Sequence, residues 1–232
     1  MDEVIFPQID HTALSEKVYL VLRTKILKRE LKFGQKLLID DIAHKLGVSR
    51  TPVKDAVNRL ALEGLVEKVP RRGTFVTTLT SRDVAELLDL RLLLQLYAAE
   101  KVLEKGRVEL LLAEMEKCMA NLDRVANGDD LDREAWMSWN RDLHLSLIRL
   151  ADNSHLLQTY EGLNIDLRLG QVLLYSRGVE YLVQTQQEHR AIYKALKNGS
   201  WQQVKEAIST HINTTKMEAL KALEAQVGTL HQ

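Results

Sequence analysis

The sequence contains one cysteine, Cys118, and therefore no pair that could form a disulfide within the chain. Chains with little cysteine are typical of reducing compartments, so we expect a cytoplasmic protein. The sequence has no uninterrupted apolar run of membrane-spanning length, and its Met-Asp-Glu-Val start is not that of a signal peptide, so we expect no membrane partner. Only three prolines and three phenylalanines occur among 232 residues. With abundant leucine and alanine, this composition favours helix over sheet.

The motifs of common enzyme classes are missing as well. The sequence has no glycine-rich phosphate loop, no His-Glu-x-x-His motif and no nucleophile elbow. The sequence therefore predicts a binding protein, not an enzyme.

Net charge is also absent, since 32 lysines and arginines balance 32 aspartates and glutamates. The charges are unevenly distributed, however. Residues 1–79 carry 14 basic and 10 acidic side chains, and residues 80–232 carry 18 basic and 22 acidic side chains. A basic first third joined to an acidic remainder is typical of a DNA-binding module linked to another domain. We therefore predict a DNA-binding domain at 1–79 and a second domain at 80–232.

The most informative pattern lies within residues 39–60. It predicts a short helix, a tight turn at Gly47-Val48 and a second helix capped by Ser49, which together form a helix-turn-helix. An amphipathic segment at Leu14–Lys28 predicts a further helix before it. The second helix of the motif has an apolar stripe that would anchor it to the domain, formed by Val53, Ala56, Val57 and Leu60.

Basic side chains lie at the start of this second helix and further along it. A DNA-reading helix uses its N-terminal residues, here Ser49, Arg50 and Thr51, to touch bases and phosphates. Lys54 lies one turn after Arg50, and Arg59 lies further along. Taken alone, such a row of basic residues is equally typical of a solvated helix face.

Two short strands are predicted after the helix-turn-helix, at Glu67–Val69 and Thr74–Thr77. A hairpin in this position is the wing of a winged helix. Its tip would place basic side chains beside a glycine, which suits contact with a phosphate backbone or a minor groove: Arg71, Arg72 and Gly73. The motif, the hairpin and the basic tip occur in the order of a winged helix, which predicts binding to double-stranded DNA.

From residue 80 onward the pattern is helical. Thr80, Ser81 and Asp83 form a typical helix N-cap. Apolar residues then recur at helical spacing in segments with short connections, including one at 127–130, which predicts an all-α bundle of about six helices. The segments are Val84–Lys105, Glu109–Ala126, Glu134–Ala151, Ser154–Ser176, Val179–Lys197 and Trp201–Ala225.

Three predicted helices of the bundle carry histidines among apolar positions. Asn140 and His144 are four residues apart and share one helix face. His189 and His211 lie on two further helices. Inward-facing histidines on separate helices can converge on a metal ion, but a lone histidine on a helix is more commonly a hydrogen-bonded core or surface residue. Arg91, among leucines, either reaches the surface or lies inside.

The N-terminal pattern resembles the GntR family of bacterial transcription regulators, in the segments 37–66 and 71–76. The resemblance implies that Arg50, Thr51 and Lys54 contact operator DNA and that Gly73 lies at the wing tip. Lys54 stands where the family usually has arginine, and lysine cannot make a bidentate fork to guanine. Some members carry a basic residue before the first helix of the motif, where this chain has Asp40-Asp41.

The remainder resembles the FCD effector domain of the FadR-type branch of that family. The resemblance rests on the segments 140–144, 151–153, 188–192, 198–200 and 211–212, with Ala195 and Ala207. In FCD domains with this pattern, an Asp or Asn and three histidines hold a divalent metal, often assigned as zinc or nickel. The matching residues here are Asn140, His144, His189 and His211.

The resemblance also implies an effector cavity beside the metal. An arginine at the place of Arg91 often faces this cavity, and Arg168 is a second candidate for effector binding. For both arginines, an ion pair elsewhere is the alternative. Because Asn140 is a neutral ligand, the site would keep the full +2 charge of the metal, which a small carboxylate effector would neutralise.

These inferences support a ligand-responsive regulator that binds a palindromic operator as a homodimer, since the symmetry of half-sites mirrors that of the protein. Two alternatives remain for the second domain. It could be a metal-dependent hydrolase with a metal-activated water, although no inward general base is evident in the sequence. The metal could also be purely structural.

Overall fold

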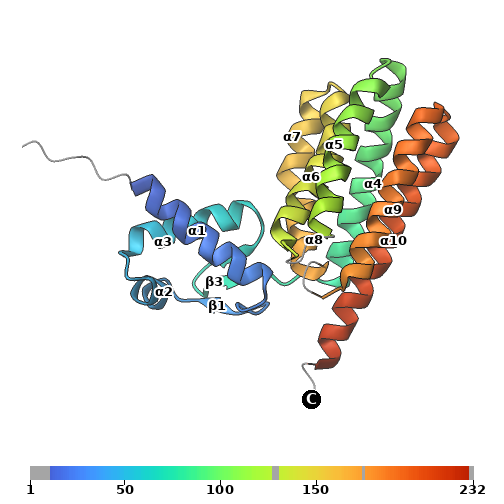
Figure 1. Cartoon of the computed structure of the whole chain (residues 1–232). Helices are drawn as coiled ribbons and strands as arrows, with labels where there is room; N and C mark the ends of the chain where they lie inside the picture. Colours follow the sequence, from blue (N-terminus) through green and yellow to red (C-terminus); the bar gives the residue numbers. More distant parts are fainter. Residues whose placement is uncertain (1–10, 127–130, 174–175, 230–232) are drawn as a thin grey trace, which may run out of the picture. The chain divides into compact units, whose positions relative to one another are not determined.

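The computed structural model describes residues 11–126, 131–173 and 176–229. The chain forms two compact units, and the division falls between Thr78 and Leu79. Figure 1 shows a small mixed unit and a bundle of long helices, which confirms the predicted fold class. Within the described ranges, no helix combines the length and the apolar character needed to cross a bilayer.

The N-terminal unit is a winged helix. Its antiparallel sheet has the strand order β1-β3-β2, and α1 packs against α3. Buried apolar side chains from both helices form its core, among them Leu22, Ile26, Val53 and Leu60. Its elements are α1 (His11–Leu27), β1 (Lys36–Leu37), α2 (Ile39–Leu46), α3 (Arg50–Leu62), β2 (Val66–Val69) and β3 (Gly73–Val76).

The turn between α2 and α3 has the predicted form. Gly47 adopts the left-handed conformation, with φ 65° and ψ 32°, and ends α2. This conformation costs a glycine little because it has no Cβ. Ser49 occupies the N-cap position of α3 with extended backbone, but its side chain accepts no capping hydrogen bond. The predicted cap is therefore right in position and wrong in its hydrogen bond.

Strand β1 is absent from the sequence prediction. It pairs with the wing strand β3, with Lys36 opposite Phe75 and Leu37 opposite Thr74. A strand of two residues is too short to show the alternation of apolar and polar side chains that predicts a strand, and β3, with which it pairs, lies almost forty residues later in the chain. Gly73 begins β3 with φ 116°, and a Cβ there would lie 2.9 Å from Cε of Lys36. The Lys36 side chain has a flexible end that could move away, so it is the φ of 116° that favours glycine at the wing tip.

The C-terminal unit is an all-α bundle. A capping box starts it, since Oγ1 of Thr80 accepts from the Asp83 amide at 3.1 Å and Asp83 accepts from the Thr80 amide at 2.8 Å. In this bundle α6 packs against α4, α5, α7 and α8, and α10 packs against α4 and α9. The helices are α4 (Ser81–Glu104), α5 (Val108–Ala126), α6 (Arg133–Leu150), α7 (Ser154–Leu163), α8 (Ile165–Leu173), α9 (Val179–Asn198) and α10 (Trp201–Thr229).

One predicted helix was wrong. Where one helix was predicted over 154–176, the described residues form two helices, α7 and α8, which are separated at Asn164. Asn164 has φ 47°, a left-handed conformation that asparagine tolerates better than most residues and that ends a helix. The predicted connection at 127–130 lies outside the described residues.

Candidate metal centre and DNA-binding surface

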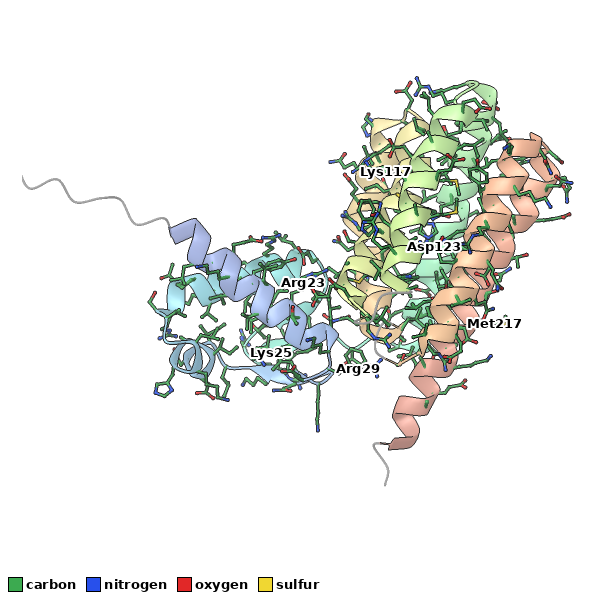
Figure 2. The ribbon with its side chains drawn as sticks, in the orientation of Figure 1. Arg23, Lys25, Arg29, Lys117, Asp123 and Met217 are labelled. Carbon is green, nitrogen blue, oxygen red and sulfur yellow. The ribbon has the colours of Figure 1, made fainter. Side chains whose placement is uncertain are left out.

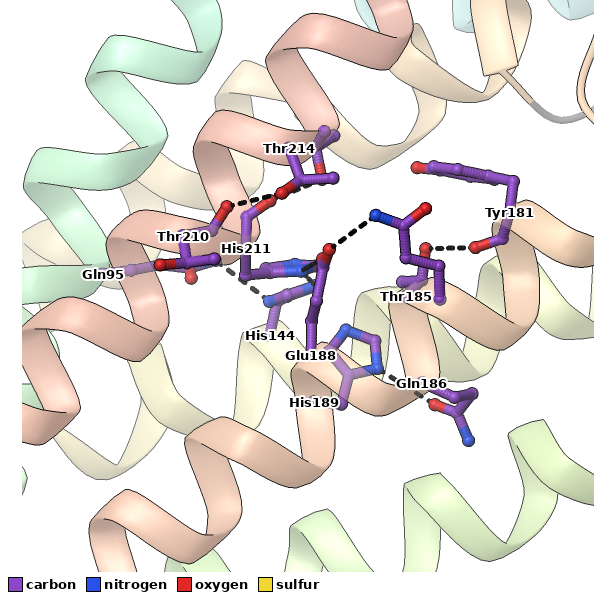
Figure 3. A network of polar contacts seen from close by, with 12 residues as sticks. Gln95, His144, Tyr181, Thr185, Gln186, Glu188, His189, Thr210, His211 and Thr214 are labelled. Carbon is purple, nitrogen blue, oxygen red and sulfur yellow. Dashed lines mark hydrogen bonds and ion pairs between the residues drawn. The ribbon is translucent and has the colours of Figure 1, made fainter.

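His144, His189 and His211 converge from α6, α9 and α10 (Figure 3). Their ring centroids are 4.8 to 5.2 Å apart, and one potential ligand atom from each lies within 4.8 Å of the others. All three side chains are buried. The structure therefore brings together the three histidines that the sequence placed on separate helices.

Each imidazole has an outward nitrogen, Nδ1, with a polar neighbour. Nδ1 of His189 lies 3.0 Å from Oε1 of Gln186, and Nδ1 of His211 lies 2.8 Å from the Glu188 carboxylate. Nδ1 of His144 lies 3.2 Å from Nε2 of Gln95. These contacts orient the rings so that their Nε2 atoms point toward one another in the interior of the bundle.

The interior nitrogens suit a metal. Nε2 of His144 and Nε2 of His211 are 3.4 Å apart, and Nε2 of His189 is buried with no hydrogen-bond partner among the described residues. Burial and the nearby Arg91 charge lower the pKa of His211 to about 3. Burial likewise holds the pKa values of His144 and His189 well below the ordinary range. The rings are therefore neutral at physiological pH, the form that binds metals.

Asn140 completes the candidate ligand set. It lies one turn before His144 on α6, and its buried Oδ1 also has no hydrogen-bond partner in the described part of the chain. Asn140, His144 and His211 line one cavity. A divalent cation would satisfy both unpartnered lone pairs, that of Asn140 and that of His189, which are otherwise costly to bury. The donor set therefore fits a metal ion.

Arg91 lies inside, on the wall of the same cavity. Its Nη2 is 2.9 Å from Oδ1 of Asp166 on α8, although the contact is not aligned as a hydrogen bond. The cavity measures about 40 Å³. A single water molecule needs a cavity of roughly 10–15 Å³ measured in the same way, so there is room for a small polar group beside the histidines. Hydroxyl groups also line the cavity, from Tyr181, Thr185 and Thr215.

Arg168, the second arginine proposed for the effector, does not line this cavity in the described residues. Its charge lies near Asp83 instead, where it contributes to lowering the pKa of that carboxyl after the hydrogen bonds from Thr80. The prediction of an effector-binding Arg168 therefore has no support in the geometry. One helical segment was predicted where the structure has α7 and α8, so the face of Arg168 could not be assigned correctly.

Sequence reasoning missed four polar residues of the site: Gln95, Asp166, Gln186 and Glu188. A weak signal existed for Gln95, which follows Arg91 by four residues on a largely apolar helix face. Glu188 neighbours His189 in sequence but points away from it, as expected for consecutive helix residues, and reaches His211. Burial raises the pKa of the Glu188 carboxyl to about 7.

The predicted DNA-contacting residues lie at two exposed places of the N-terminal unit. Ser49, Arg50, Thr51 and Lys54 are exposed at the N-terminal end of α3. Nε of Arg50 lies 2.7 Å from the Asp40 carboxylate on α2. The wing tip is also exposed, with Arg71, Arg72 and Gly73.

Arg59 is placed differently from the prediction. Its guanidinium lies over the Tyr19 ring, 3.6 Å from the centroid, and pairs with Glu16 and Glu63. It therefore binds α1 rather than extending the row of Arg50 and Lys54. Nine residues span about two and a half helical turns, so Arg59 emerges on the side opposite to Arg50. These contacts give Arg59 a role in packing α1 on α3, and its DNA contact stays a prediction.

Comparisons with known proteins agree with this architecture. The chain matches the family model of bacterial regulatory proteins, gntR family, over residues 14–76, and the FCD domain model over residues 86–214. It is 27% identical to the uncharacterized HTH-type transcriptional regulator YdhC of Bacillus subtilis, over 84% of this chain and 86% of that protein. It is 30% identical to an uncharacterized HTH-type transcriptional regulator in an unstable DNA locus of Streptomyces ambofaciens, over 84% of this chain and 80% of that protein.

A solved structure shares the fold. McbR/YncC of E. coli superposes with a TM-score of 0.68 at 21% identity, over 90% of this chain and 97% of that chain. At this identity the likeness concerns the fold alone.

Proposed function

The chain belongs to the GntR family of bacterial transcription regulators and carries an FCD domain, and we propose that a small carboxylate bound at a metal in this domain controls its affinity for a palindromic operator. The observation that carries the proposal is the convergence of three histidines, two of which, His144 and His211, line a cavity together with Asn140 and Arg91. The matched families and relatives are transcriptional regulators, so the hydrolase alternative is set aside.

The DNA-binding part of the proposal rests on α3 and the wing. Arg50, Thr51 and Lys54 would enter the major groove, because the N-terminal end of α3 is exposed and its apolar stripe is buried. Arg71 and Arg72 at the wing tip would contact phosphates or the minor groove. Lys54 would neutralise a phosphate and add salt dependence, and base specificity would fall mainly to Arg50.

The metal would be held by His144, His189 and His211 through Nε2 and by Asn140 through Oδ1. Zinc or nickel suits a set dominated by imidazole nitrogen. When bound, the metal supplies a positive charge that attracts an anionic oxygen ligand. Arg91, on the wall of the same cavity, would pair with the carboxylate, and Tyr181 and Thr185 also line this cavity.

A homodimer is proposed because a palindromic operator has two equivalent half-sites. The outer face of α4 carries apolar side chains one turn apart, since Leu93 is 65% exposed and Tyr97 is 41% exposed. An effector that binds one arrangement of the two DNA-binding units better than another would shift operator affinity by that difference. The mass of the protein in solution, measured by light scattering, tests the dimer.

Metal analysis and DNA binding together test the central proposal. The purified protein should contain about one zinc or nickel ion per chain, and His189→Ala should lose it. A mobility-shift assay with promoter fragments should show a preference over competitor DNA that changes when metal-chelating carboxylates are added. A protein that retains specific DNA binding, loses helical content on chelation and responds to no carboxylate would instead have a structural metal. Failure to prefer any promoter fragment would refute the proposed regulator.

A further inference from the structure

The outward nitrogens of the three imidazoles have two kinds of neighbour. That of His189 faces the amide oxygen of Gln186, which can only accept a hydrogen bond, and that of His211 faces the Glu188 carboxyl, which accepts in its ionised form. That of His144 faces Nε2 of Gln95, whose N–H groups can only donate. The hydrogen bonds therefore place the ring proton on Nδ1 in His189 and His211, and on Nε2 in His144. Consistently, Nε2 of His144 can donate to Nε2 of His211, 3.4 Å away.

The orientation of Gln186 is fixed by its other contacts. Its Nε2 donates to the Met119 carbonyl at 3.2 Å and to the Asp123 carboxylate at 2.8 Å. Asp123 lies on α5 toward α9, where it pairs with Arg190 at 2.6 Å (Figure 2). Rotating this amide would place its oxygen against two acceptors. His189 is therefore held with the lone pair of Nε2 directed inward.

The orientation of Gln95 is not fixed in this way. Its second neighbour is the hydroxyl of Tyr160, 3.2 Å from Nε2, and a phenol can donate or accept. In one orientation the Gln95 amide donates toward Nδ1 of His144 and toward Tyr160. In the other orientation its Oε1 accepts from Nδ1–H of His144 and from the Tyr160 hydroxyl. Both orientations satisfy the two neighbours.

We propose that Gln95 is a positioning residue whose amide turns over when a metal binds, so that its oxygen holds His144 in the tautomer that presents Nε2 as a ligand. The ring loses a proton from Nε2 to water and takes one up on Nδ1, so its charge does not change. The inference rests on the proposed metal site and adds to it a reversible step at one of its three histidines. Gln186 holds His189 in the corresponding tautomer, but its amide is fixed and does not turn over.

Zinc affinity of matched variants tests this role. The full-length protein is stripped with a chelator and titrated with Zn²⁺ against a chromophoric competitor. Gln95→Met removes the acceptor and should weaken zinc binding by about 10–100-fold. Gln95→Glu, which can only accept, should bind zinc as tightly as the unmodified protein or more tightly. Gln186→Glu should weaken binding, because the new carboxylate would face that of Asp123.

A spectroscopic measurement on the unmodified protein is independent of variant stability. Long-range ¹H–¹⁵N correlation spectra of histidine-labelled protein distinguish the two tautomers. Without zinc, His144 should carry its proton on Nε2, and with zinc it should carry it on Nδ1. Protonation of Nδ1 before zinc is added would overturn the proposal, and so would equal losses of affinity in Gln95→Met and Gln95→Glu. Zinc uptake unchanged in both variants would refute this role alone, whereas no uptake by the unmodified protein would refute the metal site as well.

Discussion

Removing the Arg91 guanidinium should destabilise the C-terminal unit as well as abolish its effector response. The side chains of Arg91 and Asp166 are only 3% and 5% exposed, and their nearest charged atoms are 2.9 Å apart. A buried carboxylate without its partner costs far more than the intact pair contributes. Arg91→Met keeps an unbranched side chain but leaves Asp166 uncompensated.

The expected loss can be estimated from this burial. Breaking one side of a buried ion pair costs about 3–5 kcal/mol. Because the Arg91–Asp166 contact is not aligned as a hydrogen bond, we expect the lower end of this range. For a unit of this size, 1 kcal/mol shifts the midpoint of thermal unfolding by roughly 2–4 °C. Arg91→Met should therefore lower the midpoint by about 6–12 °C.

The double variant Arg91→Met with Asp166→Asn is the matched control. It removes both charges, so it should recover most of the lost stability, while its carboxylate response should remain absent because the guanidinium is missing. Thermal unfolding followed by circular dichroism measures stability, and a DNA mobility shift measures the response. Unfolding of Arg91→Met at the temperature of the unmodified protein, or a double variant no more stable than the single one, would refute the reasoning.

Three further predictions concern the metal, pH and DNA. Zinc at about 100 times its Kd should stabilise the protein by about 2.7 kcal/mol, and His189→Ala should show no such gain in calorimetry. The pKa of His211, lowered to about 3, lies below its unfolded value of 6.5. The unfolded chain therefore takes up protons first as the pH falls, and metal-stripped protein should lose about 2 kcal/mol from this ring between pH 7 and 5 in urea titrations. Glu188, whose pKa is raised to about 7, changes the stability in the opposite direction by a similar amount, so the net loss at low pH should come from His144 and His189, whose pKa values burial also lowers. Lys54→Ala should reduce the salt dependence of operator affinity by about one phosphate contact in fluorescence anisotropy. The control Arg59→Ala should leave that slope unchanged and lower stability instead.

The N-terminal fold was largely predictable because its signals are local. Gly47 and Ser49 mark the turn of the helix-turn-helix, and the apolar stripe of α3 follows from spacing within one helix. Strand β1 escaped prediction because its hydrogen bonds are made to β3, far along the chain. The contacts of Arg59 with α1 escaped prediction because they depend on how α1 packs, although its distance from Arg50 already places it on the other side of the helix.

The candidate metal site shows the same division. Sequence spacing placed Asn140 and His144 on one face and His189 and His211 on two further helices, and the resemblance to FCD domains assigned these four residues to one metal. Whether the three histidines converge depends on how α6, α9 and α10 pack together. The periodicity of one helix shows which of its faces is apolar, but not which face of another helix it will contact.

The sequence by itself therefore determined most of the helical segments, the DNA-binding motif and the residue types that can bind a metal, because these depend on neighbours a few positions apart. Tertiary structure alone decided the break at Asn164, the pairing of Arg91 with Asp166 and the partner of each outward imidazole nitrogen. The contact between His144 and Gln95 joins residues 49 positions apart, and that between His144 and His211 joins residues 67 apart. Such contacts form only when whole helices pack against one another. Burying a polar group without a hydrogen-bond partner is costly, so the favoured packing is one that gives each buried polar group a partner.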